Sequence, residues 1–238
     1  MRREDPGIGQ ASHRIRVVNC FDDLVSTRFV GDINALCWPR QLAGDFQAII
    51  DQLQADDGIT SIEDDDLRAL TLSPSGSVAR NVLLADQALL RGQGIAPTLD
   101  CINGYARDDA PGPIPTDVYS FHVDSAPVQA DTYLCTYIGS SSEGLPNEMA
   151  TRRVDVAETR AELLKTYGRA DDAGFAAYLR EQCYDLHYWP RPGAKPYTFG
   201  LGNLWRIAIA YPDCPVLPCI HRAPLTPPGA SARLLLIS

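Results

Sequence analysis

The spacing of apolar residues changes near residue 97, and this change constrains the fold more than any other feature of the chain. Before it, two segments repeat apolar residues at the spacing of one helical face, which predicts amphipathic helices. These are residues 44–58, with Phe46, Ile49, Ile50 and Leu53, and residues 77–94, with Val78, Val82, Ala85 and Leu89. After residue 97 the chain turns to short segments rich in β-branched and aromatic residues, separated by turn residues, which predicts strands.

These predicted strands define the architecture that we expect. They cover residues 98–105, 117–124, 131–139, 204–211 and 233–238. A helical insertion at about 154–182 interrupts them. We therefore predict an α+β fold in one domain, residues 1–238, in which residues 1–96 are mainly helical support and residues 97–238 form a β-sandwich or barrel.

Composition excludes several classes of partner. The formal net charge is −9 and no Lys/Arg cluster is visible, so nucleic acid and anionic membrane are not expected partners. No stretch approaches the roughly 18 apolar residues of a membrane span. The seven cysteines are scattered without a CxxC pair, and the first residues lack the apolar core of a signal peptide. We expect reduced thiols and a cytoplasmic location, while the oligomeric state stays open.

Two potential metal ligands stand one residue apart in a predicted strand, His122 and Asp124. Strand side chains alternate between faces, so these two point the same way, about 7 Å apart along the backbone. The spacing alone is weak evidence, because a surface pair is the ordinary alternative. A third ligand must come from the remaining histidines. His13 lies in a predicted arm and His187 in an aromatic segment, whereas His221 begins the loop that leads to the last strand.

The order of these residues resembles a known family. His-x-Asp at 122–124, His221 roughly 100 residues later, and Arg233 at the start of the last strand resemble the iron(II)/2-oxoglutarate-dependent oxygenases. Residues 132–139 are similar to a strand of their prolyl-hydroxylase-like branch. The resemblance covers about residues 97–238 and implies a double-stranded β-helix (a jelly roll, cupin-like). The whole chain also resembles a little-characterised bacterial family of unknown function, through residues 32–42 and 221–238.

The oxygenase resemblance implies a chemistry. His122, Asp124 and His221 would be the catalytic ligands of Fe(II), leaving three positions for 2-oxoglutarate and O₂. Arg233 would bind the distal carboxylate of 2-oxoglutarate as a fork, with the hydroxyl of Tyr137 as a second donor. By strand parity Tyr133 and Cys135 share the face of Tyr137. The expected reaction is oxidation of a C–H bond (hydroxylation, desaturation or cyclisation) in a small molecule, an amino acid or a peptide.

Substrate-facing residues are expected on the segment leading toward His122, namely Asn103, Tyr105 and Arg107, with residues 108–116 and 139–148 as lid loops. Two other functions stay open. One is a non-haem iron oxidase or oxygenase that does not use 2-oxoglutarate, because the interval from His221 to Arg233 is long and Leu235 stands where the family often has a polar residue. The other is a non-catalytic jelly-roll binding module.

Overall fold

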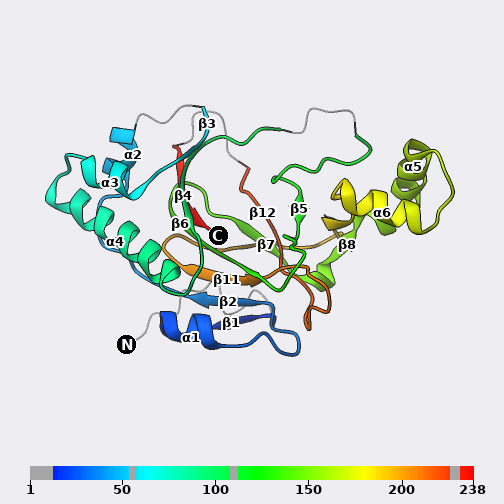
Figure 1. Ribbon diagram of the computed structural model, residues 1–238, viewed down its shortest axis with the longest axis horizontal. Helices are drawn as coiled ribbons and strands as arrows, with labels where there is room; N and C mark the ends of the chain where they lie inside the picture. The colour runs from blue at the N-terminus through cyan, green and yellow to red at the C-terminus, as the bar shows by residue number, and fades with distance from the viewer. Residues whose placement is uncertain (1–12, 54–56, 108–111, 226–230) are drawn as a thin grey trace.

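Two mostly antiparallel sheets form the centre of the molecule (Figure 1). The computed structural model describes residues 13–53, 57–107, 112–225 and 231–238. The seven-stranded sheet has the order β1 (Ile15–Val17), β2 (Ala35–Trp38), β11 (Leu204–Ala208), β6 (Asp131–Ile138), β13 (Arg233–Ile237), β4 (Thr98–Asn103), β3 (Gly58–Ser61). The six-stranded sheet has the order β10 (Tyr197–Thr198), β7 (Glu143–Leu145), β12 (Ile220–Arg222), β5 (Phe121–His122), β9 (His187–Pro190), β8 (Ala150–Arg152). The predicted α+β class is confirmed.

Successive strands alternate between the two sheets in two parts of the chain. From β4 to β7, and again from β10 to β13, each strand lies in the sheet opposite to the one before it. Neighbours within a sheet are therefore distant in sequence. In particular, β5 pairs with β12 in the six-stranded sheet, and β13 lies between β6 and β4 in the seven-stranded one.

Apart from the first helix, which packs against β2 and β11, the helices lie at two ends of the molecule (Figure 1). The helices are α1 (Phe21–Ser26), α2 (Gln47–Leu53), α3 (Asp64–Ala69), α4 (Pro74–Arg91), α5 (Ala157–Tyr167) and α6 (Ala173–Glu181), with short 3₁₀ helices at Asn147–Met149, Arg153–Asp155 and Tyr184–Leu186. Figure 1 shows α2, α3 and α4 at one end and α5 and α6 at the other. None of the described helices combines the length and the apolar run that crossing a bilayer requires.

The N-terminal part contains more β-structure than the helical pattern predicted. Besides its four helices it supplies β1, β2 and β3, which form both edges of the seven-stranded sheet. Segment 139–148, predicted to be a lid loop, also contains a strand, β7, which pairs with β10 and β12. Short strands such as these escape a sequence reading because their pairing partners are distant in the chain.

The buried face of α4 differs from the predicted one. Its buried positions are Gly76, Ala79, Leu83, Asp86, Gln87 and Leu90, whereas the predicted Val78 (43% exposed), Leu89 (38% exposed), Ala85 and Val82 are exposed or half-buried. The apolar residues that define the true face are interrupted by a buried carboxylate, Asp86. A pattern built from apolar residues alone therefore selected the neighbouring face.

The carboxylate of Asp86 is tolerated in the core because it pairs with the buried guanidinium of Arg40. The two guanidinium nitrogens of Arg40 donate to the two carboxylate oxygens of Asp86 at 2.6 and 2.8 Å, and the hydroxyl of Tyr137 donates to the same carboxylate at 2.7 Å. Burial by itself lowers the pKa of Arg40, but the bonds to Asp86 outweigh it and raise that pKa above its ordinary value. This cluster joins α4, β6 and the segment after β2 into one core.

We predict that Asp86→Ala lowers the free energy of unfolding by about 3–5 kcal/mol, because it leaves the guanidinium of Arg40 buried without a counter-charge. Chemical denaturation followed by circular dichroism measures the change. The matched control is Asp65→Ala, since the Asp65 side chain is 95% exposed beside Arg68 and such a pair contributes at most about 1 kcal/mol. Equal stabilities for the two variants would contradict this account of the core.

Candidate metal centre

Two histidines from distant parts of the sequence lie directly opposite each other. His122 on β5 pairs with His221 on β12 in antiparallel register, so both side chains lie on the same face of the six-stranded sheet. Their ring centroids are 4.7 Å apart. The pairing of β5 with β12 thus brings together two of the three ligands that the sequence predicted.

Asp124 lies two residues after the end of β5, and its carboxylate reaches the same point. Its backbone is fixed by Ala210, whose N–H donates to the carbonyl of Asp124 at 2.8 Å. The Oδ1 atom of Asp124 lies 3.9 Å from Nε2 of His122 and 3.7 Å from Nε2 of His221. One ligand atom from each of the three side chains lies within 4.8 Å of the other two.

Both imidazoles are held in the tautomer that a metal requires. Nδ1 of His122 donates to the carbonyl of Ser120 at 2.7 Å, and Nδ1 of His221 donates to the carbonyl of Cys219 at 3.3 Å. A carbonyl only accepts, so Nδ1 carries the proton in the neutral form of each ring and Nε2 is the nitrogen left to bind a metal. Burial, together with the neighbouring His221, lowers the pKa of His122 to about 4. His122 is therefore neutral at pH 7 and ready to coordinate.

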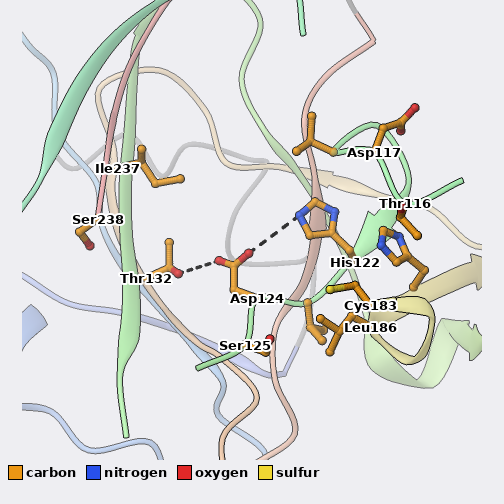
Figure 2. A pocket seen from close by; sticks show the side chains of 13 residues that line it. Thr116, Asp117, His122, Asp124, Ser125, Thr132, Cys183, Leu186, Ile237 and Ser238 are labelled. Atoms are coloured by element: carbon orange, nitrogen blue, oxygen red, sulfur yellow. Dashed lines mark hydrogen bonds and ion pairs between the residues drawn. The ribbon is translucent and has the colours of Figure 1, made fainter. Parts of the chain in front are cut away.

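The carboxylate of Asp124 is ionised and its two oxygens have different partners. Burial by itself raises the pKa of Asp124, but the nearby His221 and a hydrogen bond from Thr132 together lower it below its ordinary value. The Thr132 hydroxyl on β6 donates to Oδ2 at 2.6 Å, while Oδ1 faces the histidines. Figure 2 shows the carboxylate lying between Thr132 and His122.

This donor set fits a divalent transition metal. Imidazole and carboxylate ligands bind such ions at roughly 2.0–2.2 Å, so neighbouring ligand atoms on one ion lie about 3 Å apart. The observed separations of 3.7 and 3.9 Å require the side chains to close by about 1 Å. Two histidines and one carboxylate with open positions are typical of non-haem Fe(II) sites. The group can therefore bind a metal ion.

A cavity of about 540 Å³ adjoins two of the three candidate ligands, His122 and Asp124. Its lining includes His122, Asp124 and Thr132, together with Thr116, Asp117, Val118, Val123, Ser125, Cys183, Leu186, His187, Ile237 and Ser238. His187, the alternative ligand, lies opposite His122 on β9, with ring centroids 5.7 Å apart. Its Nδ1 is 3.0 Å from the hydroxyl of Ser120, so it lies beside the triad. His13 is exposed near Asp32 and Glu148.

Arg233 is buried (5% exposed) at the start of β13 among hydroxyl groups. It donates to the hydroxyls of Tyr105 (2.8 Å), Thr136 (2.9 Å) and Ser142 (2.6 Å). Its Nε has no partner, and no carboxylate among the described residues forms an ion pair with it. Burial accordingly lowers the pKa of Arg233.

The structure does not bring Tyr137 and Tyr133 to this arginine. Both belong to the hydrophobic core on the helix-covered face of the seven-stranded sheet, and the hydroxyl of Tyr137 is bonded to Asp86. The side chains that face Arg233 from β6 have the opposite parity, with Thr136 in the place expected for Tyr137. The prediction chose the wrong face of β6. The signal that it missed is the pair Thr132 and Thr136, polar residues four apart in an apolar strand.

The three predicted substrate residues are separated. Tyr105 lies beside Arg233. Asn103 is exposed and donates to the carboxylate of Asp57, because its neighbour Ile102 is the residue of β4 that packs between the sheets. Arg107 is exposed, with its guanidinium 4.2 Å from the ring centroid of Tyr119. In the predicted lid 108–116, residues 108–111 lie outside the described residues and Thr116 lines the cavity.

No protein-family model, curated protein or solved structure matches this chain. The residues of the site and their geometry therefore carry the functional argument.

We predict that the protein binds one Mn(II) or Fe(II) ion per chain under anaerobic conditions, measured by titration calorimetry. His122→Ala, Asp124→Ala and His221→Ala should each remove binding while leaving the circular dichroism spectrum unchanged, because each removes one of three ligands from a chain with its own core. The matched control, His13→Ala, should bind as the unmodified protein does. Full binding by His221→Ala would show that the ligand set is a different one.

Proposed function

We propose that this protein is a non-haem Fe(II) oxygenase that uses 2-oxoglutarate and O₂ to oxidise a C–H bond of a small molecule, an amino acid or a peptide. Three features support the proposal together: the alternating strand order, the triad of His122, Asp124 and His221, and the buried Arg233. The observation that carries it is Arg233, because it distinguishes this function from other uses of the same triad.

The strand order supports a double-stranded β-helix. Eight strands take part in the alternation, in two sets of four with the orders β11-β6-β13-β4 and β10-β7-β12-β5. Two facing four-stranded antiparallel sheets built from alternating strands are the arrangement of a jelly roll. In this arrangement β5 and β12 bring His122 and His221 together, and β13 carries Arg233 on the facing sheet.

The environment of Arg233 supports a bound carboxylate. A buried guanidinium without a counter-charge is costly, and its cost is relieved when an anion forms a bidentate pair with it. Arg40, the buried arginine of the helix-side core, has such a partner in Asp86. Among the described residues, Arg233 instead has three neutral hydroxyl partners, and its Nε has none. A carboxylate group of a bound ligand would supply the counter-charge that Arg233 lacks within the part of the chain that the structure describes.

Strand β13 carries Arg233, where the anion would bind, and also contributes a residue to the cavity beside the candidate metal ligands. Arg233, Leu235 and Ile237 alternate onto one face of β13, and Ile237 lines the cavity beside the triad. Leu235 between them packs in the apolar core between the sheets. A ligand that reaches from the triad to Arg233 therefore meets polar groups at both ends and apolar side chains between them. 2-Oxoglutarate, with a 2-oxo acid at one end and a carboxylate at the other, has this pattern.

Different residues would bind the metal ion and orient the co-substrate. An iron(II) ion held by His122, Asp124 and His221 would supply open positions where 2-oxoglutarate and O₂ meet, and with them the oxidising power for a C–H bond. Arg233 orients the co-substrate through its distal carboxylate, and Tyr105 and Thr136 hold the guanidinium in place. The apolar residues between the sheets keep water away from the co-substrate.

We predict that 2-oxoglutarate binds the anaerobic Mn(II)-loaded protein in titration calorimetry, and that Arg233→Ala weakens this binding on the order of 100-fold. Arg233→Lys should recover part of the loss, because an ammonium gives a point charge without the fork. Tyr105→Phe should cost about tenfold, the effect of removing one hydrogen bond to a charged group. The matched control is Tyr137→Phe, whose hydroxyl bonds Asp86 and which should leave 2-oxoglutarate affinity unchanged.

The outcomes separate the possible functions. With Fe(II) and O₂ present, release of succinate from 2-oxoglutarate supports the proposal. Metal binding without any 2-oxoglutarate binding would contradict it and favour an iron oxygenase that binds its substrate directly. Co-substrate binding without succinate release, in the presence of candidate substrates, would favour a non-catalytic binding module.

A further inference from the structure

We infer that Thr132 is a positioning residue that limits Asp124 to one metal bond and thereby sets the number of open positions on the bound ion. This inference rests on the metal-binding part of the proposed function. It assigns a role to a side chain of the seven-stranded sheet, whereas the three ligands come from the six-stranded sheet and the segment that follows β5.

The hydrogen bond from Thr132 gives the two oxygens of the Asp124 carboxylate different partners. Its hydroxyl donates to Oδ2 of Asp124 at 2.6 Å, because an ionised carboxylate only accepts. The other oxygen, Oδ1, is the atom nearest to the two histidine Nε2 atoms. In Figure 2 the two oxygens of Asp124 point in opposite directions, one toward Thr132 and the other toward His122. Thr132 therefore holds Oδ2 away from the point where the ligands converge.

The position of Thr132 is fixed by the sheet. The residue is buried (6% exposed), and its backbone pairs with Ile207 of β11. Its β-branched side chain has restricted χ1 freedom. The donor thus comes from a rigid element, while Asp124 lies in the segment just after a two-residue strand. This arrangement lets a side chain fixed by the seven-stranded sheet orient the carboxylate of Asp124, whose backbone is held by the hydrogen bond from Ala210.

The number of Asp124 oxygens that bind the metal determines how many coordination positions stay open. If Asp124 bound through both oxygens, the triad would occupy four of six positions and a chelating 2-oxo acid would take the remaining two. With one oxygen bound, three positions stay open, enough for the chelating acid and one further small molecule. Thr132 would preserve this third position.

The number of water molecules on bound Mn(II) tests the inference without any turnover. It is measured by the broadening of the Mn(II) EPR lines in ¹⁷O-enriched water, on protein saturated with metal and free of 2-oxoglutarate. Thr132→Val keeps the shape of the side chain and removes the donor, so we expect the bound ion to carry one water fewer than in the unmodified protein. Thr132→Ser restores the donor and should restore the water.

The matched control is Thr136→Val, which changes the same residue type on the same face of β6 but at a hydroxyl that contacts Arg233. Its water count should equal that of the unmodified protein. If Thr132→Val binds metal with an unchanged water count, the inference is wrong while the metal site stands. If the unmodified protein binds no metal, the proposed function fails first. Thr132→Ala provides the same comparison should the valine variant fold poorly.

Discussion

The residues of β6 alternate between two environments, and the rest of the structure depends on this alternation. Tyr133, Cys135 and Tyr137 point into the core beneath the N-terminal helices, while Thr132 and Thr136 point into the space between the sheets. Because the side chains alternate from Thr132 to Tyr137, before the register shift opposite Leu234 and Leu235, a shift by one residue would exchange the two sets. It would expose the core to polar groups and the site to apolar ones. The alternation therefore fixes both the packing of the helices and the chemistry of the cavity.

The two buried arginines near β6, Arg40 and Arg233, differ in how their charge is compensated. Arg40 is buried on the helix side with a bidentate carboxylate partner, so its charge is neutralised within the fold. Arg233 is buried on the other side among neutral hydroxyls, with one nitrogen that has no partner among the described residues. A fully paired buried charge contributes to a specific core, whereas a buried charge without a partner costs stability unless a ligand supplies one. The contrast between the two sites is the strongest argument that the space between the sheets receives an anion.

The three side chains that could bind a metal are positioned by hydrogen bonds within the protein itself. Carbonyl groups of Ser120 and Cys219 set the tautomers of the two histidines, and Thr132 orients the carboxylate. These partners lie on strands or next to them, so their positions follow from backbone pairing. Preorganisation of this kind reduces the conformational entropy lost on binding. It also explains why the site needs a two-sheet fold, since two ligands come from one sheet, the third from the segment that follows β5, and the donor to the carboxylate from the other sheet.

The sequence by itself determined the α+β class, the helices within residues 44–58, 77–94 and 154–182, and the triad of His122, Asp124 and His221 as a group able to bind a metal. Those depend on periodicity and residue type. Tertiary structure decided which face each element buries. Helix α4 packs through the face that carries Asp86, one residue along from the predicted face. The hydroxyl of Tyr137 bonds Asp86 on the helix side of the sheet, away from Arg233. The roles of Thr132, Thr136 and Ser142 also emerged only in three dimensions, because an isolated hydroxyl in a strand acquires a function through partners that are distant in sequence.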